Sequence, residues 1–118
     1  MSGVVGTSSS KSKLVGKFVD TAKAWCNFNG TGTPAIRTSF NCSSITDVNT
    51  GRYEVNYTHP MKSQFHAPVS SQGGSVVNVL VVNEDQNAGV GKCEIGVYRW
   101  DTGAYDDTAH VFVAVFGD

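Results

Sequence analysis

Residue types that could carry out catalysis are few in this sequence, and they are scattered. The histidines are His59, His66 and His110, and their spacing does not match the HxH or HExxH pattern of a metal site. The acidic pairs at 84–85 and 106–107 are sequence neighbours, whose side chains usually point apart, which disfavours a catalytic pair of carboxylates. The sequence also lacks a GxSxG turn, a Walker loop and a GxGxxG segment after a strand. It therefore predicts no enzyme activity, no cofactor and no metal site, with a surface cation site at 106–107 left open beside a solvated loop.

The cysteines do not form a recognisable framework. There are three, Cys26, Cys42 and Cys93, and an odd, sparse set is not typical of a disulfide-rich domain. None lies in a CxxC or CxxH pair of the kind that binds zinc. We therefore expect three small, buried, apolar residues in strands.

Aromatic residues are the clearest candidates for binding. Tyr98, Trp100 and Tyr105 lie close together in the sequence, and Trp25 is the other tryptophan. Such side chains can stack on sugar rings, although they more often anchor a core or a subunit interface. Tyr98, Trp100 and Tyr105 are therefore candidate binding contacts, with a glycan as the ligand that stacking would suit.

The composition limits the classes of protein that fit. The chain has 118 residues, enough for one domain. Charged residues make up 16% of it and the net charge is −1, which excludes nucleic-acid binding driven by a strong overall positive charge. No apolar run approaches the roughly 20 residues of a membrane-spanning helix, so we expect neither nucleic acid nor membrane as a partner. Valine occurs 17 times and leucine twice, which favours strands over helices.

Alternating and continuous apolar runs predict an all-β domain. The predicted strands cover residues 24–29, 34–42, 52–58, 75–82, 92–100 and 110–116. A short piece at 43–46 leads to a turn at 47–51, and loops or irregular edges are expected at 59–74, 83–91 and 101–109. We expect an antiparallel β-sandwich or barrel-like domain over residues 24–118, with an extended N-terminal arm before it.

The period of each strand predicts which side chains share a face. The shared faces are Ile36, Thr38, Phe40 and Cys42 in one strand, Tyr53, Val55 and Tyr57 in the next, and Cys93, Ile95 and Val97 in a third.

Strands 75–82 and 110–116 are instead apolar on both faces, which is typical of strands covered on two sides. In so short a chain, a second copy is a natural cover for the last strand. We therefore expect a homo-oligomer, with a trimer as the expected symmetry. The predicted subunit interface consists of Val111, Phe112, Val113, Val115 and Phe116.

Residues 1–23 differ from the rest of the chain. They hold four lysines and one acid, a local charge of +3, and small apolar groups recur between polar spacers. Two interpretations stay open: a solvated tail, and an attachment arm that lies in shallow grooves or adds a strand to a neighbour's sheet. The residues predicted to dock are Val4, Val5, Lys11, Lys13, Leu14, Val15, Lys17 and Phe18.

Several segments resemble a family of tailed-bacteriophage virion proteins. They are AKAW at 22–25, NFNGTGT at 27–33, AIR at 35–37, SFN at 39–41, SSITD at 43–47, GRYEVNY at 51–57 and VFVAVF at 111–116. Such sequences are familiar from fibre-like and other structural proteins of phages of aquatic bacteria, including cyanobacteria. The resemblance is good over 22–58, moderate over the last strand and poor over 59–110, and it carries no catalytic motif.

The resemblance implies a virion part on the outer surface of the particle. Because the chain is one short domain, we expect a capsid decoration (cement) protein or a short head fibre, a homo-oligomer attached by its arm to the major capsid protein or another virion protein. The alternative is a receptor- or glycan-binding component of a tail fibre or spike. A small hydrolase or lyase is disfavoured by the missing catalytic residues.

Overall fold

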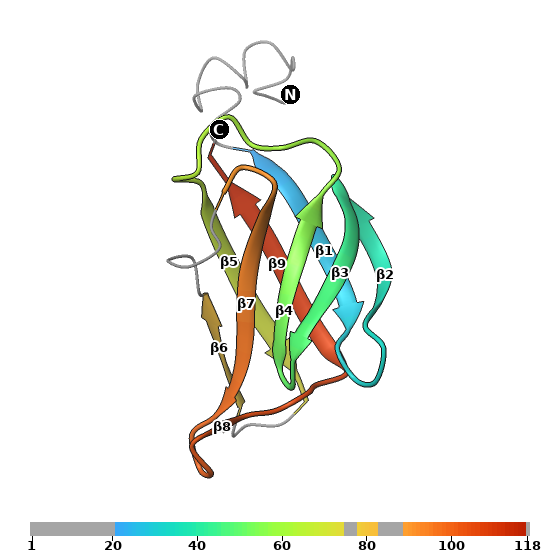
Figure 1. Ribbon diagram of the computed structural model, residues 1–118, viewed down its shortest axis with the longest axis vertical. Coiled ribbons are helices and arrows are strands. Elements are labelled where there is room, and N and C mark those ends of the chain that lie inside the picture. Colours follow the sequence, from blue (N-terminus) through green and yellow to red (C-terminus); the bar gives the residue numbers. More distant parts are fainter. Residues whose placement is uncertain (1–20, 75–77, 83–88, 118) are drawn as a thin grey trace, which may run out of the picture.

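The alternating pattern of the sequence corresponds to strands in a computed structural model, which describes residues 21–74, 78–82 and 89–117 (Figure 1). Within these residues the strands are β1 (Ala22–Asn29), β2 (Ala35–Phe40), β3 (Cys42–Asn49), β4 (Arg52–Tyr57), β5 (Ala67–Gly73), β6 (Asn78–Val82), β7 (Lys92–Arg99), β8 (Ala104–Tyr105) and β9 (His110–Phe116). In the described part of the chain, no helix is long and apolar enough to cross a membrane.

The strands form two antiparallel sheets that pack face to face. One sheet has the order β2-β1-β9-β5, and the other has the order β3-β4-β7-β6, with the short strand β8 also paired to β7. Each pairing between neighbouring strands is antiparallel. The predicted all-β sandwich is confirmed. The predicted arm residues, Val4 to Phe18, lie outside the described residues.

The core lies between the two sheets and is built by the inward side chains of both. Phe28 of β1 and Tyr53 of β4 are fully buried and meet edge to face, with ring centroids 5.3 Å apart. The predicted inward faces of β4 and β7 are confirmed, since Tyr53, Val55, Tyr57, Cys93, Ile95 and Val97 are all buried.

The predicted single strand over 34–42 is wrong, because the chain changes sheet at Asn41. Asn41 has a positive φ of 56°, a conformation that asparagine tolerates better than most residues. Its side-chain amide donates to the carbonyl oxygens of Lys23 and His59, both at 3.0 Å, and its Oδ1 accepts from the His59 backbone N–H at 2.7 Å. The corner therefore sends β2 into one sheet and β3 into the other.

The predicted common face of the 34–42 strand is also wrong. A β-bulge shifts the register between Asn27 and Phe28 of β1. Alternate side chains of β2 therefore point to opposite faces before and after the bulge. Ile36 packs against the core, whereas Thr38 and Phe40 are exposed on the other side. One extra residue in the pairing is enough to reverse the orientation of those that follow.

Three further segments differ from the prediction. Residues 59–74 were expected as a loop or irregular edge but contain the seven-residue strand β5, with Pro68 inside it. Pro68 is tolerated because β5 is an edge strand. The turn expected at 47–51 is shorter, since β3 continues to Asn49, and the loop expected at 101–109 contains β8.

Strand 75–82 is not covered on both faces within one chain, and the cover of the outer face of strand 110–116 by a second copy stays a prediction. In β6, Val79 is exposed while Leu80 packs against the core. In β9, the valines at 111, 113 and 115 are buried in the domain core, so their own chain covers them. The outward side of β9 carries Phe112, Ala114 and Phe116.

Candidate interaction surface

An apolar row crosses the outer side of the four-stranded sheet. In register, Phe40 of β2 lies opposite Trp25 of β1, Trp25 lies opposite Ala114 of β9, and Ala114 lies opposite Val69 of β5. Each step of the row joins neighbouring strands, so the side chains run continuously from one edge of the sheet to the other. We define the outer apolar face as this row together with Phe112 and Phe116 of β9.

The side chains of this face are open to solvent although they are large and apolar. Phe40 and Val69 are each 53% exposed, and Trp25 is 40% exposed. Half-buried antiparallel strands usually place polar residues on their outer side. A contiguous apolar patch on an otherwise closed sandwich is typical of a surface that another molecule covers.

A shallow depression lies on the same face. It has a volume of about 290 Å³ and is lined by Val69, Ser70, Ser71, Phe112, Val113 and Ala114. It follows the seam between the edge strand β5 and the central strand β9. A side chain from a partner can therefore seat beside Phe112 without any opening of the sandwich.

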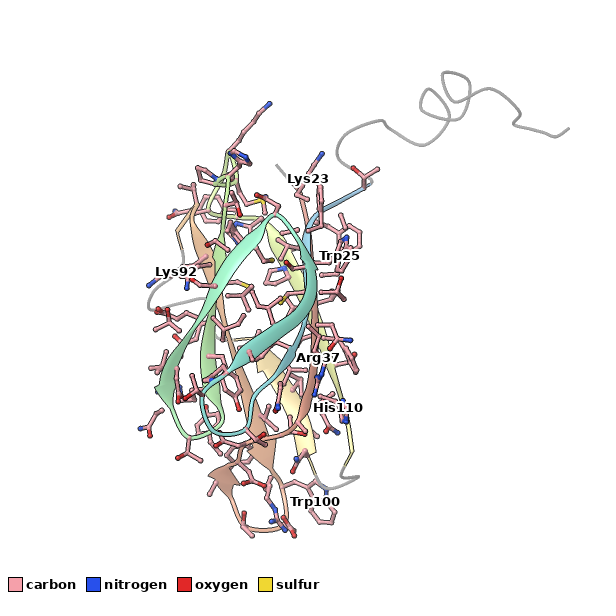
Figure 2. The ribbon with its side chains drawn as sticks, turned by 90° about the vertical axis from the view of Figure 1, so that its right-hand side faces the viewer. Lys23, Trp25, Arg37, Lys92, Trp100 and His110 are labelled. Atoms are coloured by element: carbon pink, nitrogen blue, oxygen red, sulfur yellow. The ribbon has the colours of Figure 1, made fainter. Side chains whose placement is uncertain are left out.

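The electrostatic character of the face is neutral to basic. The four strands β1, β2, β5 and β9 contain no Asp or Glu, whereas Lys23 and Arg37 lie on β1 and β2. The guanidinium of Arg37 donates to Asn27 Oδ1 at 3.3 Å, and Figure 2 shows Trp25, Arg37 and His110 along one side of the molecule. The other sheet carries acids, and two of them, Glu54 and Glu94, are ion-paired.

The structure divides the predicted interface into two parts. Val111, Val113 and Val115 belong to the domain core, and only Phe112 and Phe116 remain as interface candidates on the outer side. Trp25, Phe40 and Val69 were not among the predicted interface residues. In β1 the strand alternation contained a signal for Trp25. Ala24 and Cys26 on either side of it point into the core, so Trp25 must point outward.

The predicted receptor contacts separate into a packed pair and one free aromatic. Tyr98 and Tyr105 meet edge to face at 5.4 Å, and Arg52 lies 5.7 Å from the centre of the Tyr105 ring. Trp100 is 65% exposed, in the turn after β7 at the far end of the sandwich (Figure 2). Arg99 braces this turn by donating to both carboxylate oxygens of Asp101, at 3.0 and 2.7 Å. That hydrogen bonding lowers the pKa of Asp101.

Asp107 has a structural role. Its Oδ1 accepts from the Gly51 backbone N–H at 2.7 Å and from the Tyr53 hydroxyl at 3.0 Å. Tyr53 also donates to the Gly30 carbonyl at 2.7 Å, so one buried phenol links the ends of both sheets to the 101–109 segment.

The other titratable residues of ranges 21–74, 78–82 and 89–117 do not form a metal centre. His66 is buried, with its Nε2 3.0 Å from the Tyr57 hydroxyl and its Nδ1 3.0 Å from the Ser63 carbonyl oxygen. His59 and His110 are exposed. Across the described residues, no three His, Cys, Asp or Glu side chains are grouped as metal ligands would be.

Comparisons of the chain with models of known protein families, with curated proteins and with solved structures gave no match.

Proposed function

We propose that this protein is a non-enzymatic structural component of a bacteriophage virion, a capsid decoration protein or short head fibre, which assembles with copies of itself through the outer apolar face. One observation carries the assembly part of the proposal: the continuous row Phe40–Trp25–Ala114–Val69 left open to solvent. The virion part derives from the resemblance of residues 22–58 and 111–116 to phage structural proteins.

The chemistry of the face suits a second copy. Interfaces between permanently associated identical subunits are more apolar than other protein surfaces, and aromatic residues are enriched at their centres. The outer apolar face has that composition, and the absence of acids from its four strands leaves no carboxylate to be desolvated when it is covered. The symmetry that we propose is the trimer.

The attachment role belongs to residues 1–23 in this proposal. The arm's lysines and small apolar groups would bind the major capsid protein or another virion protein. The arm would join the domain at β1, which begins at Ala22. The attachment test mixes undecorated capsids with the full chain or with a chain that lacks residues 1–20. Binding of the full chain alone supports the arm's role, and equal binding of both removes it.

The assembly test is the mass of the full chain in solution. Sedimentation velocity over a wide range of concentrations should show an oligomer that dissociates on dilution, and the thermal midpoint should rise with protein concentration. A monomer at every concentration would overturn self-assembly through this face.

A second candidate function rests on Trp100. Its exposure at the end of the sandwich favours contact with a glycan on a host surface. A glycan array that gives a signal with the native chain, loses it with Trp100→Ala and keeps it with Trp25→Ala would support a receptor-binding role. Absence of any signal from the assembled native protein would count against it.

A further inference from the structure

The three thiols come from three strands and all lie in the core of the sandwich. Cys26 lies on β1 of the four-stranded sheet, and Cys42 and Cys93 lie on β3 and β7 of the other sheet. None of the three forms a disulfide, and all three are buried. The expectation of three buried cysteines in strands is therefore confirmed.

Cys26 and Cys42 are held next to each other by the corner at Asn41. The Cys42 thiol donates to the backbone carbonyl of Trp25, the residue before Cys26, at 3.4 Å. Ser39 is the cross-strand partner of Cys26, and its hydroxyl donates to the Cys42 carbonyl oxygen at 3.4 Å. Cys42 is thus held by its thiol to the residue before Cys26, and by its backbone carbonyl to the cross-strand partner of Cys26.

The two sulfurs share one interaction and differ in chemical character. Hydrogen bonding between the thiols lowers the pKa of Cys42, and the same hydrogen bond, together with burial, raises the pKa of Cys26. Cys42 is also the more exposed residue of the two, at 9% against 2%. Attack on an oxidant depends on the thiolate and on access, so Cys42 has the properties of the attacking sulfur and Cys26 those of the resolving one.

We propose that Cys26 and Cys42 form a latent disulfide that joins the two sheets, made by mild oxidation with hydrogen peroxide. The Cys42 thiolate attacks one peroxide oxygen, the O–O bond breaks, and hydroxide leaves and is protonated to water, which gives the sulfenic acid of Cys42. The Cys26 sulfur then attacks the Cys42 sulfur, the S–O bond breaks, and a second water leaves with the Cys26 proton. Two thiols and one peroxide become one disulfide and two waters.

The disulfide would fasten the corner where the chain passes between sheets. It closes the loop from residue 26 to residue 42, which holds all of β2 and the bulged part of β1. Closing a loop of this length constrains the unfolded chain, and we expect the thermal midpoint to rise by about 10 °C. The proposal concerns a covalent modification inside one copy, so it does not depend on the assembly proposed above.

Trypsin separates the three cysteines, which makes the test direct. Cleavage after Lys23, Arg37, Arg52, Lys92 and Arg99 places them in peptides 24–37, 38–52 and 93–99. The folded full chain is treated with stoichiometric peroxide, the remaining thiols are alkylated, and the digest is measured by mass spectrometry without reduction. We expect peptides 24–37 and 38–52 joined with the loss of two hydrogens, and peptide 93–99 alkylated.

Two variants give the control. Cys93→Ala should keep the cross-link and the rise in thermal midpoint, and Cys42→Ala should lose both while the reduced forms of each remain folded. A cross-link that includes peptide 93–99, a link between two chains, sulfinic acid at Cys42, or complete alkylation of all three cysteines in the wild-type chain would each overturn the proposal.

Discussion

The carboxylate of Glu94 on β7 is buried and forms an ion pair with the guanidinium of Arg52 on β4. In register, Glu94 lies directly opposite another acid, Glu54, which pairs with Lys92 at 2.8 Å. The two ion pairs therefore cross the β4–β7 ladder diagonally, and each cation offsets the repulsion between two carboxylates that face each other.

The two pairs are expected to differ in strength because they differ in burial. Arg52→Ala leaves a buried carboxylate without its cation and should lower the free energy of unfolding by about 3 kcal/mol. Lys92→Ala removes the cation of the more exposed pair and should cost less than about 1 kcal/mol. Urea unfolding of both variants measures the difference, and equal losses would contradict this account of Glu94.

Substitutions at two adjacent residues of β9 should distinguish the stability of the domain from its self-association. Val113 is buried in the core, so Val113→Asp should destabilise the domain by more than about 4 kcal/mol, through burial of an unpaired charge. Ala114 lies on the outer side at the centre of the apolar row, so Ala114→Asp should change the unfolding free energy by less than about 1 kcal/mol. The same variant should weaken self-association at least about tenfold.

The pair is measured by urea unfolding at low concentration and by sedimentation velocity. A folded Ala114→Asp protein that assembles like the wild type would show that the outer apolar face is not the interface. A stable, folded Val113→Asp protein would contradict the assignment of Val113 to the core.

Gly51 is expected to be the least replaceable residue of the β3–β4 turn. Its φ is +69°, and an added Cβ would lie 2.5 Å from the backbone nitrogen of Asp106. Gly51→Ala should therefore cost about 3 kcal/mol, from the strained backbone and from displacement of the Asp106 segment. Gly32 has a similar φ of +62° with open space around it, so Gly32→Ala should cost about 1 kcal/mol. Thermal or urea unfolding compares the two, and equal costs would exclude the steric contribution.

The buried phenol of Tyr53 should make the domain sensitive to alkali. Burial and the hydrogen bond with Asp107 raise the pKa of Tyr53 above its usual value of 10.0. Above pH 10 the unfolded chain then binds fewer protons at this residue than the folded chain does. Stability therefore falls as the pH rises past that value, by at most about 1.4 kcal/mol per pH unit.

Tyr53→Phe should remove this part of the alkaline loss, at a cost of about 1–2 kcal/mol at neutral pH from the lost hydrogen bonds to Gly30 and Asp107. Unfolding midpoints between pH 8 and pH 11 give the comparison. An unchanged slope in Tyr53→Phe would show that another group controls it.

The sequence predicted the elements whose pattern is local and regular. In β4 the alternation of Tyr53, Val55 and Tyr57 was sufficient, because the facing sheet covers one side of the strand and every second side chain is buried there. The strand β5 could not be predicted in this way. Its segment APVSSQG has little apolar character, and it becomes a strand because β9 offers a complete set of backbone partners from Ala67 to Gly73.

The candidate surface was predicted only in part, for a related reason. The apolar outer side of β9 was visible in the sequence, since Phe112 and Phe116 alternate with core valines. That Trp25, Phe40 and Val69 extend it depends on which strands are neighbours and on a bulge at Asn27–Phe28, and neither is a property of any one segment. The register that creates the row is set by tertiary pairing.

Strands β1 and β9 lie side by side, and Ala22 is the register partner of Phe116. The described chain consequently enters and leaves the sandwich at one pole, while Trp100 sits at the opposite pole (Figures 1 and 2). A fluorescent tag or a tether joined near the start of β1 or the end of β9 would therefore be attached at the same pole. A copy anchored there would stand upright on its support and hold Trp100 at its distal tip.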